Sequence, residues 1–207
     1  MEEQKKNAPD ALWRPMTQHK PLLNNRPKHI VRGEGCFMIN EDGDRILDAT
    51  AGLWCVNVGH GRKELAEVAK AQMEKLAYVI PVMTSDPAVE LSAKMLEMLG
   101  MDKGHVYFTS SGSEANETAF KIVRQYHLQS GNPRKSKIIS RHRAYHGNTL
   151  ATMSATGQAE RKIGYEPLAP GFLHVPPPYP YRRHAKFTVE RSEERRVGKE
   201  CRSRWSP

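Results

Sequence analysis

Two serines flank a glycine in the stretch Thr-Ser-Ser-Gly-Ser-Glu at residues 109–114, where a strand-like pattern gives way to a helix-like one. Ser111 and Glu114 have the spacing of a capping box, which marks the start of a helix. Free backbone amides gather at such a start, where the helix dipole is positive. Gly112 has no Cβ, so an anion can approach these amides closely. Taken alone, the stretch is equally compatible with a plain helix cap and with a phosphate-binding site.

The residue pattern of this stretch favours a single phosphate group over a nucleotide. It matches neither G-x-x-x-x-G-K-[ST] nor G-x-G-x-x-G, so a nucleoside triphosphate or a dinucleotide is not indicated. Ser111 and Ser113 would add hydroxyl donors to the backbone amides. If the stretch binds a ligand, a lone phosphate group fits it best.

A second polar turn, Tyr145-His146-Gly147, follows the strand-like stretch at residues 137–140. In a parallel α/β unit, this turn lies at the same carboxyl edge as residues 111–113, and ligands of open α/β sheets bind at that edge. Tyr145 could then cover a ring whose phosphate group the first stretch holds. The two motifs together strengthen the phosphate interpretation over the plain cap.

Metal sites and disulfides are not expected. His142 and His146 are four residues apart, but no helix is expected there, so they do not have the geometry of a metal-binding pair. Cys36, Cys55 and Cys201 are odd in number and widely separated. They therefore predict neither a zinc site nor a disulfide framework.

The rest of the pattern predicts an α/β fold that positions the two turns. A strand, a helix and a strand follow one another within about 35 residues, which is typical of parallel α/β units. Before them, apolar residues recur at three- and four-residue steps, as in amphipathic helices. The expected elements are a hairpin of residues 36–39 and 45–47 around an Asp-Gly turn, helices over 63–76 and 88–99, strands at 105–109 and 137–140, and a helix that begins near Ser113.

The N-terminal region is expected to be an arm that precedes this fold. Residues 1–30 are polar and contain proline, with Leu12, Trp13 and Met16 as the side chains expected to dock. Residues 51–62 contain several glycines and are expected to form a loop.

Composition excludes several classes of protein. The chain has 207 residues, of which 38% are hydrophobic, and no apolar run approaches the roughly 20 residues of a membrane helix. The N-terminus has neither the apolar core of a secretory signal nor the arginine-rich, acid-poor character of a transit peptide. We therefore expect a cytoplasmic protein without a membrane partner.

The formal net charge of +9 is concentrated at the C-terminus. Residues 182–207 contain nine Lys or Arg and four Glu, and they show no sustained apolar period. This segment is expected to be unfolded. The charge raises the alternative of a nucleic-acid-binding protein, but no recognisable reading motif accompanies it. Nucleic acid is therefore not the expected partner.

Four stretches resemble the class III, fold type I pyridoxal phosphate aminotransferases: ILDATAGLWCVNVGHGR, VYFTSSGSEANETAFKIVRQYH, KIISRHRAYHGNT and ATGQAERKIGYEPLAPGFLHVPPPYPYR. The resemblance covers about residues 10 to 182 and is greatest to the branch that pairs ω-amino acids such as taurine or β-alanine with pyruvate. It implies an incomplete fold type I aminotransferase of the α/β class. Residues 1–55 would form the arm and hairpin, 56–182 a partial parallel-sheet cofactor domain, and 183–207 a foreign or disordered basic tail.

The resemblance also implies roles for individual residues. Leu53 and Trp54 match positions that line the substrate pocket, although core packing is the alternative for Trp54. Glu114 and Asn116 are interpreted as helix-start residues. The residues that match the family's pyridoxal 5'-phosphate site, through its phosphate loop and its ring-stacking turn, are Ser111, Gly112, Ser113, Tyr145 and His146.

The implied reaction is a two-stage amino transfer from a small amino donor to pyruvate, in which the cofactor serves as the electron sink. In the family, the lysine that carries the cofactor and the acid that keeps its pyridine nitrogen protonated come from later sequence, and no residue of this chain matches them. The chain is therefore expected to be inactive alone. A homodimer is implied for the full-length enzyme, and a catalytically silent partner of a full-length subunit is the remaining alternative.

Overall fold

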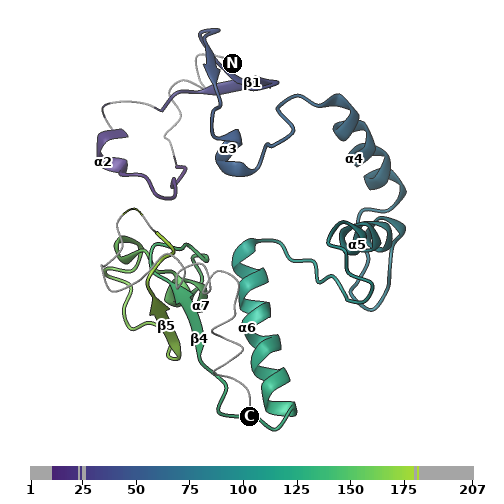
Figure 1. Cartoon of the computed structure of the whole chain (residues 1–207). Helices are drawn as coiled ribbons and strands as arrows, with labels where there is room; N and C mark the ends of the chain where they lie inside the picture. The colour runs from purple at the N-terminus through teal and green to yellow at the C-terminus, as the bar shows by residue number, and fades with distance from the viewer. Residues whose placement is uncertain (1–10, 23, 25–26, 180, 182–207) are drawn as a thin grey trace. The chain divides into compact units, whose positions relative to one another are not determined.

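The computed structural model divides into two units by its internal contacts, Met1–Ala88 and Val89–Pro207 (Figure 1). The division falls within one helix, and each unit is described by itself. The predicted boundaries at residues 55 and 182 stay predictions, and the predicted basic tail lies outside the described part of the chain. The residues that the structure describes are 11–22, 24, 27–179 and 181.

The first unit contains a three-stranded antiparallel sheet. β2 (Phe37–Asn40) and β3 (Arg45–Leu47) form the predicted hairpin, with Phe37 opposite Leu47. Asn40 closes its turn, because its Oδ1 accepts a hydrogen bond of 2.7 Å from the amide of Asp44. The hairpin is confirmed.

A further strand, β1 (Ile30–Glu34), pairs with β2 and was not predicted. Arg32 and Gly33 interrupt its apolar pattern, and its register shifts between Ile30 and Arg32. A strand with such an irregularity gives little periodic signal in the sequence.

Within the described residues of the arm, His19–Leu22 form the short helix α2. Leu12, Trp13 and Met16 are exposed by 63%, 85% and 75%. The prediction that these side chains dock is wrong for the described residues.

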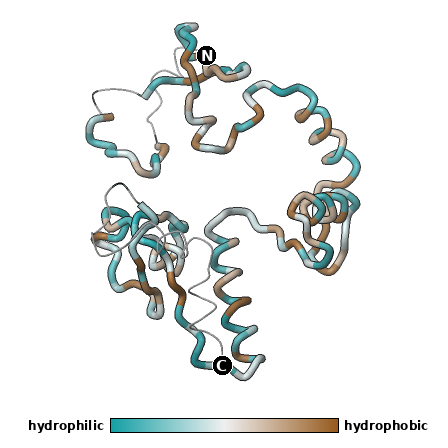
Figure 2. The backbone as a smooth tube through the Cα atoms, in the orientation of Figure 1, coloured by the Kyte–Doolittle hydropathy of each residue, from teal (hydrophilic) through white to brown (hydrophobic). Residues whose placement is uncertain are grey.

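Two amphipathic helices were predicted, and both form. α4 spans Lys63–Lys75 and α5 spans Asp86–Met98. α5 begins at an Asp-Pro step and ends just before Gly100, whose φ of +64° suits a helix C-terminus. Their apolar side chains remain exposed, and Figure 2 shows apolar and polar residues alternating along both helices. No residue of either helix is buried.

The second unit contains a parallel α/β arrangement. β4 (Ile138–Arg141) pairs in parallel with β5 (Phe172–Val175), and α7 (Leu150–Ala155) and the short 3-10 helix η1 (Ala159–Arg161) lie between them in the chain. α6 (Gly112–Gln129) runs alongside (Figure 1). The Phe120 ring of α6 meets the Phe172 ring of β5 edge-on, with centroids 5.3 Å apart. The predicted α/β class is confirmed.

The predicted strand at residues 105–109 is wrong. These residues form no sheet pairing, and the parallel pair is made by β4 and β5 instead. A strand needs a neighbour to satisfy its backbone donors and acceptors, and the described residues provide none for this stretch. The apolar residues of this stretch therefore do not form a strand here.

The buried interior of the second unit is mostly polar. Among the described residues, Ile39 and Ala155 are the buried hydrophobic residues, one in each unit. Around Ala155, buried hydroxyl side chains make hydrogen bonds to backbone atoms of the segments that carry the second turn. Such bonds are expected, because a buried polar group loses its hydrogen bonds to water. These residues are Ser140, Thr152, Ser154 and Thr156.

Among the described residues, no helix combines the length and the apolar character that crossing a membrane requires.

Candidate functional site

The first motif caps α6 as predicted. Ser111 is the N-cap, with extended φ and ψ of −156° and 160°, and its Oγ accepts a hydrogen bond of 3.2 Å from the amide of Glu114. The Glu114 carboxylate in turn accepts a 2.8 Å hydrogen bond from the amide of Ser110, one residue earlier than in the standard capping box. Glu114 is thus a helix-start residue, as interpreted from the sequence.

Two backbone amides at this end of α6 lack an acceptor within the described residues, those of Gly112 and Ser113. A Cβ added to Gly112 would meet no heavy atom within 4 Å, so the space beside this residue is open. α6 has 18 residues, long enough for a substantial dipole. Open amides at the positive end of a helix form an arrangement that binds phosphate.

The second motif lies directly beside this helix end. The Asn116 side-chain amide donates a 2.7 Å hydrogen bond to the His146 carbonyl. The Ser113 hydroxyl donates to Asn148 Oδ1 at 3.2 Å, and the Asn148 amide is 3.3 Å from Ser113 Oγ. A Cβ on Gly147 would lie 2.5 Å from Ser113 Oγ, so this close approach requires glycine. The structure therefore brings the two predicted motifs together.

Glu117 adds a further link between α6 and the segment after the turn. Its Oε1 accepts hydrogen bonds from the Thr149 hydroxyl at 2.6 Å and from the Ala151 amide at 3.2 Å. Because the Ser113 hydroxyl bonds to Asn148, Ser113 offers a ligand mainly its backbone amide. The role of the Ser111 and Ser113 hydroxyls in holding a phosphate group stays a prediction.

Thr156 supports the turn at residues 145–147 through its side-chain hydroxyl. Its side chain is fully buried, and its Oγ1 donates to the Thr152 carbonyl at 3.0 Å and accepts from the His146 amide at 3.0 Å. The next residue, Gly157, donates a 2.8 Å backbone bond to Ala144. The turn is therefore supported by the buried Thr156 hydroxyl and by the backbone hydrogen bond from Gly157 to Ala144.

Tyr145 belongs to the second motif, and its ring is partly exposed. The residue is 52% exposed, and the guanidinium carbon of Arg161 lies 5.0 Å from the ring centroid. This is a cation–π contact, in which the cation approaches the face of the ring. One face of the Tyr145 ring is thus approached by Arg161, and a stacking ligand would use the other.

His146 has a ring nitrogen without a partner. Its Nε2 is buried and makes no hydrogen bond within the described residues. Burial lowers the pKa of His146 below its ordinary value, and the charges of Arg141 and His174 lower it further. The imidazole is therefore held neutral at neutral pH, and its buried Nε2 has no hydrogen-bond partner among the described residues.

Two other histidines near the turn, His142 and His174, contact each other through their rings. His142 stacks on His174, with centroids 5.4 Å apart and an interplanar angle of 27°. His174 Nε2 lies 3.2 Å from the Ala155 carbonyl oxygen. The described residues contain no group of three or more His, Cys, Asp or Glu side chains placed to hold a metal ion.

Leu53 and Trp54 lie in the first unit on a left-handed turn. α3 (Ala51–Trp54) has φ of +47°, +57°, +67° and +66° along its four residues. For the three that are not glycine, this conformation costs about 1–2 kcal/mol each. Leu53 is 61% exposed and Trp54 77% exposed. Core packing, the alternative for Trp54, is therefore wrong in this unit.

Asp48 stabilises this turn. Its Oδ2 accepts a 2.7 Å hydrogen bond from the amide of Gly52 and lies 2.9 Å from His60 Nε2, and its Oδ1 accepts from the Thr50 hydroxyl at 3.3 Å. The Gly52 amide and then the His60 side chain lower the pKa of Asp48 below its ordinary value. The carboxylate is therefore charged throughout the neutral range.

Sequence reasoning missed most of the residues that hold the two motifs together. Asn148 and Thr156 received no role, and neither did Asp48 or His60. The Thr-x-x-Thr spacing of residues 149 and 152 at the start of α7 was the available signal, because it is typical of a helix cap. The remaining contacts join residues far apart in sequence, and no local pattern marks them. They are made by Asn116, Glu117, Asn148 and Thr156.

Comparison with known proteins places this geometry in a family context. A family model described as Aminotransferase class-III matches residues 22–203. The matched range includes most of residues 183–207, whose foreign origin stays a prediction.

Several curated relatives are aminotransferases. An uncharacterized aminotransferase of Bacillus subtilis, YhxA, is 57% identical over 73% of this chain and 33% of its own length. A taurine–pyruvate aminotransferase of Bilophila wadsworthia is 44% identical over 80% of this chain and 36% of its own length. A putrescine–pyruvate aminotransferase of Pseudomonas aeruginosa is 41% identical over 81% of this chain and 37% of its own length. The chain thus spans a third or slightly more of the length of these relatives.

Solved structures show the same fold. An aminotransferase of Bacillus anthracis is 46% identical with a TM-score of 0.80, covering 91% of this chain and 42% of that one. An amine transaminase from an uncultivated Pseudomonas species, in its pyridoxal phosphate-bound form, is 28% identical with a TM-score of 0.83. That match covers 96% of this chain and 45% of the other. The two turns therefore belong to a fold type I transaminase architecture.

Proposed function

Because the chain belongs to the class III aminotransferase family, we propose that it supplies the phosphate-binding and ring-binding part of a pyridoxal phosphate-dependent aminotransferase. The observation that carries this proposal is the open helix start of α6 beside the turn that bears Tyr145. The amides of Gly112 and Ser113 and the Ser111 hydroxyl would hold the phosphate group. When bound, the cofactor supplies an electron sink for the amino transfer.

The second turn would orient the cofactor ring. Tyr145 has an exposed ring face suited to stacking, which contributes about 0.5–1.5 kcal/mol beyond buried area. The neutral His146 ring, with its unpartnered Nε2, fits a polar group of the ligand. An open helix start, an exposed ring and an orphaned polar atom together fit pyridoxal phosphate.

The proposed reaction transfers an amino group from an ω-amino acid of the taurine or β-alanine type to pyruvate. Its support is the similarity to a taurine–pyruvate aminotransferase. The similarity to a putrescine–pyruvate aminotransferase makes a diamine the alternative donor. We propose that Leu53 and Trp54 form an apolar wall of the donor pocket, which suits the methylene chain shared by these donors.

The cofactor-bearing lysine and the acid at the pyridine nitrogen are not assigned to any of the 207 residues. Lys121 lies on α6, beyond the phosphate-binding end, and Lys137 and Lys162 match no cofactor-bearing position. We propose that this chain alone binds the cofactor without catalysing transfer. A homodimer is proposed for the complete enzyme, supported by the exposed apolar side chains of α4, α5 and α6.

Ligand binding tests the proposal without requiring turnover. Pyridoxamine 5'-phosphate is the appropriate probe, because its amine does not condense with surface lysines as an aldehyde would. Calorimetric titration of the chain should show it binding at least about tenfold more tightly than pyridoxamine, since several charge-assisted hydrogen bonds are lost without the phosphate. Equal affinities for the two probes would contradict the phosphate site.

Two variants locate the binding within the site. Gly112→Ala fills open space without touching protein atoms, so it should weaken the phosphate probe and leave the weak pyridoxamine binding unchanged. Tyr145→Ala should weaken both probes by about three- to tenfold, through the lost stacking. Tyr126→Ala, at a similarly exposed tyrosine near the C-terminal end of α6, is the matched control and should change neither affinity.

A further inference from the structure

The left-handed turn of α3 lacks the packing that would explain its conformation. Leu53 and Trp54 are both mostly exposed, and no ring contact involves the Trp54 indole within the described residues. Backbone bonds from Trp54 to Thr50 and from Cys55 to Ala51 close the turn but do not select its hand. The selecting contact must come from outside the turn.

Asp48 makes that contact. Its Oδ2 accepts a 2.7 Å hydrogen bond from the Gly52 amide and so fixes the direction of one peptide inside the turn. Its Oδ1 accepts a hydrogen bond from the hydroxyl of Thr50, the residue just before the turn. The Asp48 side chain is 4% exposed, although the bonds that it accepts from Gly52 and Thr50 lie near the surface. The orientation of the turn is therefore determined by where this carboxylate lies.

His60 fixes the carboxylate relative to the sheet. Its ring nitrogen lies 2.9 Å from Asp48, and its backbone exchanges two hydrogen bonds with Gly35, at 2.8 and 3.1 Å, just beyond β1. A Cβ on Gly33 would lie 2.7 Å from the His60 Cβ, so glycine at position 33 lets the imidazole lie against the strand. A continuous path thus runs from β1 through His60 and Asp48 to the turn.

We propose that Asp48 and His60 are positioning residues that set the direction of Leu53 and Trp54, and through them the shape of the amino-donor side of the pocket. The role in the pocket rests on the proposed function. The positioning of the turn rests only on the contacts of the first unit. Neither residue is proposed to touch the cofactor or the reacting atoms.

Fluorescence of Trp54 provides a direct test. Trp13→Phe and Trp205→Phe in the full chain leave Trp54 as the sole tryptophan. His60→Ala in this background should release the turn and lower the fluorescence anisotropy of Trp54, because the already exposed indole loses its fixed direction. His60→Gln keeps a side-chain N–H donor that can reach Asp48, and should restore most of the parent signal.

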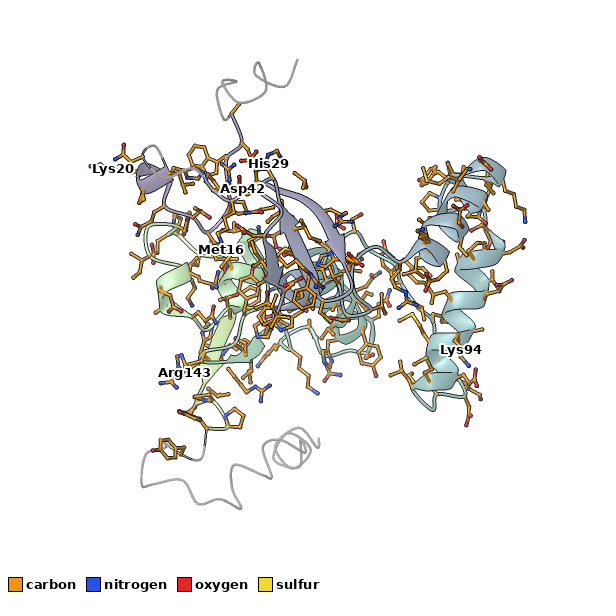
Figure 3. The ribbon with its side chains drawn as sticks, turned by 90° about the horizontal axis from the view of Figure 1, so that it is seen from above. Met16, Lys20, His29, Asp42, Lys94 and Arg143 are labelled. Carbon is orange, nitrogen blue, oxygen red and sulfur yellow. The ribbon has the colours of Figure 1, made fainter. Side chains whose placement is uncertain are left out.

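His29→Ala is the matched control. His29, labelled beside the three-stranded sheet in Figure 3, also pairs with a carboxylate, at 3.3 Å from Glu41, but this pair does not contact the turn. Its loss should leave Trp54 unchanged. The proposal is overturned if His60→Ala leaves the Trp54 signal at the parent value, or if His29→Ala changes it equally.

A measurement on the parent chain covers the case in which His60→Ala unfolds the unit. The nitrogen–proton spectrum of the unsubstituted chain should show the Gly52 amide proton shifting with the titration of the Asp48 carboxylate, and the shift should vanish in Asp48→Asn. A Gly52 amide that does not follow Asp48 would refute the positioning contact. These readouts need no cofactor, so a chain that fails to bind pyridoxamine 5'-phosphate contradicts the proposed function and leaves this test intact.

Discussion

The two turns that carry candidate ligand contacts are held in different ways. The turn at 144–149 is joined to α6 by side-chain bonds between residues 30 to 35 positions apart in sequence. The turn at 51–54 is held by Asp48, from four positions away, and by His60, twelve positions from Asp48. The first depends on side-chain contacts across 30 to 35 positions, and the second on shorter contacts that His60 ties to the segment after β1.

The start of α6 and the turn of α3 also differ in which feature of their backbone is energetically unfavourable. At the start of α6, two amides lack acceptors, which is unfavourable unless water or a ligand binds them. At α3, the backbone hydrogen bonds are made, but three residues other than glycine occupy the left-handed region. Unpaired amide donors at a helix start are suited to binding an anion. Backbone strain, in contrast, persists only where the surrounding structure fixes the conformation and with it the direction of the side chains.

The strongest test of the tertiary tie is Gly147→Ala. The new methyl group would lie 2.5 Å from both Ser113 Oγ and Thr152 Oγ1, at a residue whose φ is +137°. We expect a loss of about 2–4 kcal/mol in the free energy of unfolding, measured by urea denaturation. Gly112→Ala is the control, with a change within about 0.5 kcal/mol. Equal stability of the two variants would contradict the close approach of the turn to α6.

Thr156→Val tests the buried support of the same turn with nearly unchanged shape. It leaves the His146 amide without its acceptor, so the free energy of unfolding should fall by about 1–3 kcal/mol. The fluorescence of Trp54, which reports on the turn at 51–54, should not change, because the hydrogen bonds that hold this turn do not involve Thr156. Thr17→Val, at an exposed residue, should be neutral within about 0.5 kcal/mol.

Acid should release the local turn through Asp48. Because its folded-state pKa is lowered, the carboxylate contributes stability that is present above its ordinary pKa of 3.8 and is lost as pH falls through the lower folded value. Trp54 fluorescence in the sole-tryptophan chain should therefore stay constant down to about pH 4 and change below it. Asp48→Asn should abolish this acid transition, and a transition centred above the ordinary pKa would contradict the contact.

The smallest expected effect is a shift in the titration of His146. Its folded-state pKa lies below the ordinary 6.5, so the folded chain is fully stable above that value and loses stability as pH falls toward the folded pKa. A proton NMR titration of the imidazole should show the lowered pKa. Arg141→Met should raise it part of the way back by removing one repelling charge, and a value unaffected by this change would argue against that cause.

The sequence predicted those parts of the fold whose causes are local. Ser111 and Glu114 cap α6 because a hydroxyl and a carboxylate three residues apart can reach amides of the same turn. The hairpin at residues 37–47 follows from its Asp-Gly turn. The strand prediction for residues 105–109 was wrong because a strand forms only beside a partner. The strand β1 was not predicted because its pairing with β2 determines it more than its own residue pattern does.

By itself, the sequence determined the capped start of α6 and the amphipathic helices, since each follows from interactions within one or two helical turns. Tertiary structure alone decided that Asn116 meets His146 and that Gly147 lies against Ser113. It also decided that the glycine-containing stretch after Asp48 turns left-handed, because the carboxylate that selects this hand is itself fixed by a histidine on another segment. Contacts between distant residues leave no periodic signature, and only the folded chain specifies them.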